Sequence, residues 1–341
     1  MERIDYETLE AMLRNPEIPD AQIRPYLTGD PDASRPFDPR VVPDPALVSM
    51  DEADRFRFES AIRWGNAISR WRRQRLYELR RGGGERLPVL VSEGDSWFQF
   101  PFLIDDVVDH LGRDHLIWSL DAAGDTARNM VVKRPEYLAG LRERRADGVA
   151  AFLFSAAGND IIGEDETGEP VLKQILKRHD PARDAAWHVD QARLAAILQF
   201  LETCYRQVIT AIRAEEGFAT LPIIVHGYDY AIPSGGPGDL RDPSWAAKDE
   251  WLGAPMQANG IDDPALRRAI VRFLIDALYD MLFKIAGNSA ATRIHVVDVR
   301  GALAGVADWA DEIHATSDSF SKVAARFRTT LREAGVAGAI A

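Results

Sequence analysis

The chain has 341 residues, which is enough for one large domain or for one domain with a smaller appendage. Hydrophobic residues make up 46% of the sequence and charged residues 28%, a balance that excludes disordered and fibrous proteins. The net charge of −12 argues against a general attraction to nucleic acid or anionic membranes, and the longest apolar run, Val149 to Ala157, is about half the length that spans a bilayer.

The first 48 residues predict short helices followed by an extended segment. Residues 5–15 predict a helix that Pro16 ends, and a further turn is expected around 21–27. Residues 28–48 contain five prolines, which exclude regular helix and central strand, so we expect an extended linker or a strap on the surface. The N-terminus (MERIDYETLEAML) has no feature of a secretory signal, and the single cysteine, Cys204, fits a reducing compartment. We therefore expect a cytoplasmic, soluble protein.

A long, arginine-rich helix is predicted next. The capping box SMDE at 49–52 is expected to open it, and it is expected to run to about Arg81, where RGGGER stops it. Two interpretations of this helix remain open. The arginines can form a solvated face balanced by acidic neighbours, or a surface that docks a protein partner or an anionic lipid. Trp64 and Trp71 favour packing against the same chain, since large aromatic side chains seldom stay exposed. The arginines are at positions 55, 57, 63, 70, 72, 73, 75, 80 and 81.

From residue 87 onward, strands alternate with helices. Short apolar runs predict five buried strands, at 87–94, 115–121, 148–158, 221–229 and 292–301. Helical patterns fill the intervals, at 103–111, 128–145, 190–215, 264–287 and 318–334. This alternation predicts βαβ crossovers, a mostly parallel five-stranded sheet and an α/β fold. Ligands of such sheets bind at the carboxyl ends of the strands.

Polar motifs follow four of the predicted strands at that edge of the sheet. Gly94-Asp95-Ser96-Trp97 follows the first strand, Ala123-Gly124-Asp125-Thr126 the second, Gly158-Asn159-Asp160 the third and Asp311-Glu312-Ile313-His314 the fifth. A serine hydroxyl needs a base to become a nucleophile, and His314 can be that base while Asp311 orients it. The backbone N–H groups of Ser96 and Gly124 and the amide of Asn159 can bind an oxyanion. The helix expected after Ser96 would assist through its N-terminus.

These four motifs, in this order, resemble the blocks of the SGNH/GDSL hydrolase family. GDSW, AGDT, GND and DEIH are similar to its four blocks, so Ser96, Gly124, Asn159 and His314 correspond to S, G, N and H, and Asp311 completes the triad. The resemblance implies a flavodoxin-like three-layer α/β/α fold over residues 86–341. It also implies hydrolysis of acyl esters through an acyl-enzyme, with no metal and no cofactor. Residues 1–85 would then be a helical extension with a proline-rich linker.

The sequence does not identify the substrate. Trp97, Tyr228, Asp229 and Tyr230 are candidates for substrate binding. In the loop after the fourth strand, Tyr228, Asp229, Tyr230 and Trp245 combine aromatic surface with polar groups and can form a substrate wall; a surface excursion packed by its own aromatics is the equal alternative. Phospholipase or lysophospholipase activity is the second functional hypothesis, and sugar O-deacetylation the third. In a further hypothesis, residues 1–85 dock on a protein partner or form a homo-oligomer, so that the hydrolase is an effector under a partner's control. No nucleic-acid partner is expected.

Overall fold

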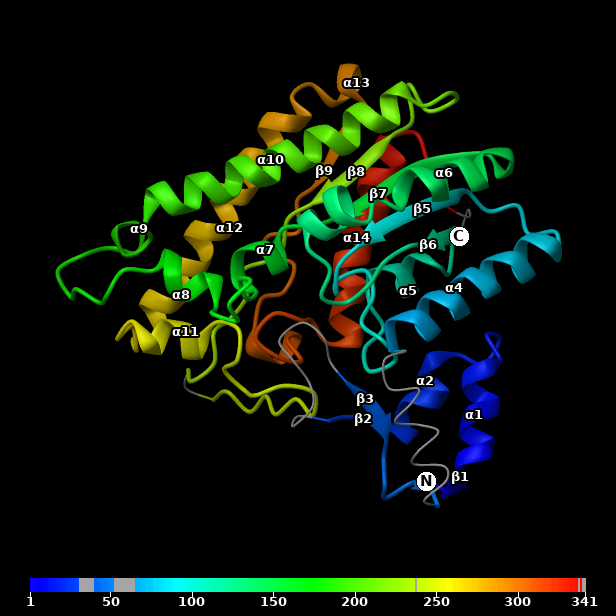
Figure 1. The fold of residues 1–341 in the computed structure, drawn as a ribbon, viewed down its shortest axis with the longest axis horizontal. Coiled ribbons are helices and arrows are strands. Elements are labelled where there is room, and N and C mark those ends of the chain that lie inside the picture. The colour runs from blue at the N-terminus through cyan, green and yellow to red at the C-terminus, as the bar shows by residue number, and fades with distance from the viewer. Residues whose placement is uncertain (31–39, 52–64, 237, 337, 339–341) are drawn as a thin grey trace.

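The computed structural model describes residues 1–30, 40–51, 65–236, 238–336 and 338 (Figure 1). The five predicted strands form one parallel sheet, and their bounds are β5 Val89–Gly94, β6 Leu116–Ser119, β7 Val149–Ser155, β8 Ile223–His226 and β9 Ile294–Val297. Their order in the sheet is β6-β5-β7-β8-β9, which is the flavodoxin-like order with the second strand outside the first. The predicted α/β fold class is therefore confirmed.

The sheet is buried on both faces at its centre. Phe152, Leu153 and Phe154 in β7 are fully buried, as are Leu90 and Val91 in β5. A parallel strand that is covered on both sides needs apolar side chains at successive positions rather than at alternating ones. This is why the strands are recognisable in the sequence as continuous apolar runs.

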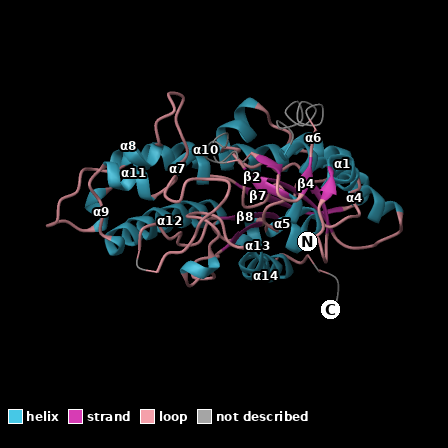
Figure 2. Cartoon of the chain, turned by 90° about the horizontal axis from the view of Figure 1, so that it is seen from below, coloured by secondary structure: helices cyan, strands magenta, loops and turns pink. Residues whose placement is uncertain are grey.

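Five helices of different lengths cover the two faces of the sheet. They are α5 Val107–Leu111, α6 Tyr137–Arg144, α10 Gln191–Ala214, α12 Pro264–Ala286 and α14 Ser317–Glu333. Helices α5 and α14 contact each other, and so do α10 and α12. Figure 2 shows α6 and α10 on one side of the strands and α14 on the other, so the molecule has the three layers that were expected.

Two predicted helices differ from those observed. The single helix expected over 128–145 is divided into a π-helical segment, Asn129–Lys133, and α6, because Pro135 cannot continue a helix. Helix α5 begins only at Val107, where the side chain of Asp106 caps it. Short helices that were not predicted are α7 Gly158–Ile162, α8 Val171–Ile175, α9 Ala185–His188, α11 Gly253–Ala258 and α13 Ser289–Thr292, with 3-10 turns at Arg145–Asp147 and Val306–Asp308. The turn expected around 21–27 contains a 3-10 turn at Arg24–Tyr26.

The N-terminal residues form a small unit with its own apolar cluster. Its elements are α1 Tyr6–Arg14, α2 Asp20–Ile23, a parallel pair of β1 Ile4–Asp5 with β4 Val48–Ser49, and an antiparallel pair of β2 Leu27–Gly29 with β3 Val41–Pro43. The expected extended segment at 28–48 thus pairs at both ends, since a two-stranded ladder tolerates proline on its free edge. Apolar side chains of this unit pack around Phe102 of the main domain.

Helix α4, Gly65–Gly82, connects the N-terminal unit to the sheet. In the predicted capping box at 49–52, Ser49 is the last residue of strand β4, and residues 52–64 lie outside the described residues. The guanidinium group of Arg72 donates hydrogen bonds to four backbone carbonyls of residues 12–18 and to the carboxylate of Asp20. On another side, Arg70 binds carbonyls at the end of β6 and Arg73 binds the Phe98 carbonyl. These arginines hold parts of the same chain together and do not form a free basic surface.

The two tryptophans of this helix give little support to the packing argument made from the sequence. Trp71 is 46% exposed, and Trp64 lies outside the described residues, as do Arg55, Arg57 and Arg63. Packing of α4 on its own chain depends instead on Arg70, Arg72 and Arg73. Across the described ranges, no helix combines the length and hydrophobicity that crossing a bilayer requires.

Candidate active site

Ser96 lies in a tight turn directly after β5. The preceding Gly94 pairs with Ser155 of β7, and a Cβ atom at Gly94 would lie 2.7 Å from the Ser155 Cβ and 2.7 Å from the Phe98 ring, so only glycine fits. The N–H groups of Phe98 and Gln99 donate to the Asp95 carbonyl at 3.0 and 2.9 Å, which closes the turn. The helix expected over 103–111 begins only at Val107, so its N-terminus does not directly follow Ser96. A single turn, and not a helix N-terminus, therefore presents the hydroxyl.

Ser96, His314 and Asp311 form a continuous hydrogen-bonded series. Ser96 Oγ lies 2.8 Å from His314 Nε2, and His314 Nδ1 lies 2.7 Å from Asp311 Oδ2. An ionised carboxylate only accepts hydrogen bonds, so Nδ1 carries the proton and Nε2 is free to accept from the serine. All three residues are buried, with Ser96 the most exposed at 4%. The arrangement can move a proton from the serine hydroxyl to the imidazole.

Asp311 is held as an anion by four donors. Its Oδ1 accepts the backbone N–H groups of Ile313 and His314 at 2.8 and 2.6 Å, and its Oδ2 accepts Trp245 Nε1 at 2.8 Å as well as the imidazole. Burial raises the pKa of this carboxyl, but the neighbouring His314 and these hydrogen bonds outweigh burial and hold the pKa below its ordinary value. The carboxylate can therefore keep the imidazole in one tautomer and one orientation.

The loop over residues 230–253 encloses the turn that carries Asp311 and His314. The carboxylate of Glu312 is fully buried and accepts four backbone N–H groups of this loop, from Ser234 and residues 251–253, at 2.6–3.0 Å. Arg241 donates to the Asp311 carbonyl at 2.7 Å, and the Trp245 ring packs against Phe100, whose own ring lies 4.5 Å from that of His314. The long loop thus fixes the position of the base.

Gly124 lies in a turn whose preceding peptide is held by α4. Its φ angle is +85°, a conformation that favours glycine. The Asn66 side chain accepts the Ala123 N–H and donates to the Ala123 carbonyl, both at 2.9 Å, and Gln99 donates to Asn66 in turn. Because both the N–H and the carbonyl of Ala123 are hydrogen-bonded, the position of the following Gly124 N–H is fixed.

Asn159 lies in the first turn of α7, beside Ser96 in the lining of one cavity. One N–H of its amide donates to the Asp125 carbonyl at 2.6 Å, and an amide group has a second N–H. The preceding Ala157 has a φ of +105°, a strained conformation for a residue with a Cβ atom. Asp160 binds the Ala127 N–H at 2.8 Å and so joins this turn to the segment after β6. Strain and hydrogen bonds together hold the amide close to the nucleophile.

A buried polar network lies behind the nucleophile. Asp95 accepts hydrogen bonds from the Trp97 N–H at 3.1 Å, from Ser155 Oγ at 2.9 Å and from the Tyr228 hydroxyl. Burial raises the pKa of Asp95 to about 6 despite these bonds. Ser155 Oγ also lies 2.8 Å from His226 Nε2, and burial lowers the pKa of His226 to about 4, so that ring is neutral at pH 7. The network anchors the Ser96 turn to β7 and β8.

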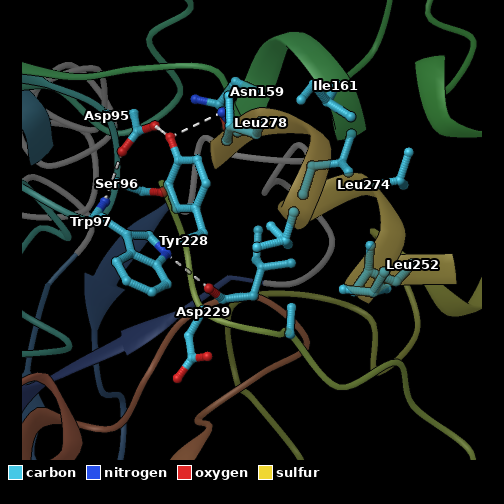
Figure 3. Close-up of a pocket in the computed structure, with 16 residues that line it drawn as sticks. Asp95, Ser96, Trp97, Asn159, Ile161, Tyr228, Asp229, Leu252, Leu274 and Leu278 are labelled. Atoms are coloured by element: carbon cyan, nitrogen blue, oxygen red, sulfur yellow. Dashed lines mark hydrogen bonds between the residues drawn. The ribbon is translucent and has the colours of Figure 1, made fainter. Parts of the chain in front are cut away.

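A cavity of about 70 Å³ opens beside Ser96. Figure 3 shows Ser96, Asn159 and Tyr228 at one end and Leu252 and Leu274 at the other. Most of its lining is aliphatic. Within the described part of the chain, no group of three or more histidine, cysteine, aspartate or glutamate side chains could hold a metal ion.

The four residues suggested for substrate binding lie in different surroundings. Trp97 lines the cavity with its indole N–H bound to the Ile313 carbonyl at 2.9 Å, and Tyr228 lines it in edge contact with Trp97. Asp229 also lines it, but its carboxylate accepts the N–H groups of Tyr230, Gly301 and Leu303, so it holds two loops together. Tyr230 is not among the lining residues, and its hydroxyl binds Asp276.

Three supporting residues were not identified from the sequence. Asn66 and Arg241 act through contacts with distant segments of the chain, and nothing in their local sequence indicates this role. Glu312 lies between Asp311 and His314 in a segment that is buried in the structure. A charged residue inside this motif was the one feature of the sequence that could have pointed to its supporting role.

The sequence matches no protein-family model and no curated protein. Several solved structures are similar at low identity. A protein described as a platelet activating factor from Streptococcus pneumonia is 12% identical, with 83% of this chain and 99% of that chain covered and a TM-score of 0.41. A protein assigned to the SGNH hydrolases from Slackia heliotrinireducens is 12% identical, covering 72% and 100%, with a TM-score of 0.42. A carbohydrate esterase of family 3 from Talaromyces cellulolyticus is 14% identical, covering 72% and 97%, with a TM-score of 0.37.

Among these structures, one is described as an SGNH hydrolase, the family that the four motifs resemble. Their TM-scores are low, so the assignment of the fold depends on the strand order of this chain, and its chemistry on the geometry around Ser96.

Proposed function

We propose that the protein is an SGNH-type serine hydrolase that cleaves carboxylic esters through an acyl-enzyme. The observation that carries the proposal is the unbroken hydrogen-bonded series from Ser96 Oγ through His314 to Asp311. A serine, an imidazole and a buried carboxylate in this geometry are the parts that nucleophilic acyl transfer needs.

In the first half of the reaction, Ser96 Oγ attacks the ester carbonyl carbon and its proton passes to His314 Nε2. Asp311 stabilises the imidazolium that forms and keeps it oriented. The negative charge on the carbonyl oxygen is bound by the backbone N–H groups of Ser96 and Gly124 and by the free N–H of Asn159. The tetrahedral intermediate then expels the alcohol, which takes the proton from His314, and the acyl group is left on Ser96.

In the second half, water replaces the alcohol. His314 removes a proton from the water as it attacks the acyl-enzyme, the same donors bind the oxyanion, and the acid is released as the proton returns to Ser96. Each step uses groups that the chain itself provides.

The division of the chain at residue 85 belongs to the same proposal. Residues 86–341 carry all the groups named in the reaction, and residues 1–85 support them. The contacts of Asn66 with Ala123 and the packing of Gly29 against Trp245 favour this supporting role, since a Cβ atom at Gly29 would lie 2.4 Å from the Trp245 Cα.

Hydrolysis of a short p-nitrophenyl ester tests the proposal. We expect turnover by the wild-type chain and a loss of about 10³-fold or more in kcat for Ser96→Ala and for His314→Ala, with unchanged thermal unfolding. An active Ser96→Ala protein contradicts the assignment of the nucleophile.

A further inference from the structure

We propose that the cavity beside Ser96 binds the acyl chain of the substrate and selects unbranched aliphatic acyl groups of about six to eight carbons. This inference rests on the proposed function and names its substrate class. Four properties of the cavity support it: its position relative to the reacting carbon, its volume, the hydrogen bonding of its polar lining and the aliphatic wall formed by α12.

The cavity lies on the acyl side of the reaction centre. The alcohol that leaves the tetrahedral intermediate must take its proton from His314 Nε2, so the leaving group lies toward His314. Among the described residues, Ser96 and Asn159 line the cavity but His314 does not. The cavity therefore contacts the nucleophile and one oxyanion donor and is separate from the proton donor, as expected for the site of the acyl substituent.

The volume of the cavity limits the length of the chain. A single water needs roughly 10–15 Å³ of such space, so about 70 Å³ accommodates roughly five to seven groups of that size. A methylene group is close to a water molecule in size. A hexanoyl group has five carbons beyond its carbonyl carbon and an octanoyl group has seven, whereas a hexadecanoyl chain is far too long.

Apart from the reacting groups Ser96 and Asn159, the polar side chains in the lining are already hydrogen-bonded within the protein. The Asp95 carboxylate is occupied by the Trp97 N–H, Ser155 and Tyr228, and the Tyr228 hydroxyl also accepts the Gly158 N–H at 2.9 Å. The Asp229 carboxylate accepts three backbone N–H groups. A hydroxyl group on the acyl chain would be buried here without a partner, which is costly.

One face of α12 forms the aliphatic wall. Val271, Leu274, Ile275 and Leu278 are spaced i, i+3, i+4 and i+7, which places them along one side of the helix, and all four line the cavity. Figure 3 shows Leu274 and Leu278 directed toward the space beside Ser96. Because this wall consists of branched aliphatic side chains, the acyl group gains by burial of methylene groups alone.

The test is a series of p-nitrophenyl esters from acetate to hexadecanoate, with kcat/KM measured below the micellar concentration of each ester. Each buried methylene is expected to raise kcat/KM about four-fold, so the hexanoate should exceed the acetate by about 100-fold or more. Beyond the octanoate, the value should stop rising and fall. The 3-hydroxybutanoate should be about ten-fold slower than the butanoate.

A variant of α12 with a matched control tests whether the cavity determines the preference for acyl-chain length. Ile275 is half-buried at the cavity wall, and Ile275→Phe fills part of the space, so we expect the hexanoate to become at least ten-fold slower and the acetate to change less than three-fold. Ala269→Phe introduces the same side chain at an exposed position of the same helix and should keep the wild-type profile. The wild-type series and the hydroxyl comparison stand even if Ile275→Phe does not fold.

The outcomes separate the inference from the function on which it rests. A profile that is highest at the acetate, or one that rises to the dodecanoate and hexadecanoate, overturns the acyl-chain proposal while ester hydrolysis stands. The rising profile would favour the phospholipase hypothesis. The absence both of hydrolysis and of fluorophosphonate labelling at Ser96 overturns the proposed function and this inference together.

Discussion

Replacing Trp245 with phenylalanine removes one hydrogen bond from Asp311 and leaves an aromatic ring against Phe100. The bond joins the indole N–H to the carboxylate oxygen that also accepts the His314 proton, at 2.8 Å. A hydrogen bond to a charged group contributes about 1.5–3 kcal/mol, and 1.36 kcal/mol corresponds to a factor of ten in rate. The other three donors to Asp311 remain, so we expect kcat/KM to fall by about 10- to 100-fold without loss of folding.

Trp309→Phe is the matched control for this prediction. Trp309 is buried in the same turn region as Asp311, and its indole N–H has no hydrogen-bond partner among the described residues. The assay is kcat/KM for p-nitrophenyl butanoate together with thermal unfolding of both variants. The reasoning is refuted if Trp245→Phe retains activity within two-fold of wild type, or if Trp309→Phe loses as much as Trp245→Phe.

Further predictions concern Asn66, Glu312 and Glu93. Asn66→Ala releases the Ala123 peptide next to Gly124 and should lower kcat/KM about ten-fold or more, whereas Arg75→Ala on the exposed side of the same helix should be neutral in the same assay. Glu312→Gln leaves about two of four buried N–H groups without an acceptor, so urea unfolding should report a loss of about 2–6 kcal/mol; a loss below 1 kcal/mol contradicts this. Burial raises the pKa of Glu93 well above 4.5, so the folded protein keeps this carboxyl protonated at pH values at which the unfolded chain has lost the proton. The free energy of unfolding therefore falls as pH rises above 4.5. Glu93→Gln should therefore be more stable than wild type at pH 8 and have a flatter profile of unfolding free energy against pH; equal profiles would count against it.

The sheet was predictable because its physical cause is local. A parallel strand covered on both faces is mostly apolar at successive positions, and the five runs follow this pattern apart from polar residues such as Ser92 and Glu93 in β5 and His295 in β9. The candidate site was predictable for a related reason, since the motifs at Ser96, Gly124, Asn159 and His314 each follow the carboxyl end of a strand. The structure brings Ser96, His314 and Asp311 into hydrogen-bond distance, although 215 or more residues separate the serine from the other two.

The supporting contacts were not predictable because they are made between distant segments. Arg72 binds carbonyls 54–60 residues earlier in the chain, and Glu312 binds N–H groups 59–78 residues earlier. Local charge patterns do not show whether an arginine meets solvent or a distant carbonyl, so the arginine-rich helix remained ambiguous. The helix expected over 103–111 is present but begins later than predicted, because the Asp106 side chain caps α5 at Val107.

The central claim is that Ser96 is an activated nucleophile, and labelling with a fluorophosphonate probe tests it most directly. The probe reports nucleophilicity without requiring the natural ester. We predict that wild-type protein gains one probe mass, that peptide mapping by mass spectrometry locates the adduct on Ser96, and that Ser96→Ala and His314→Ala are not labelled. Labelling of Ser96→Ala at the wild-type rate, or an adduct on another residue, would contradict the account.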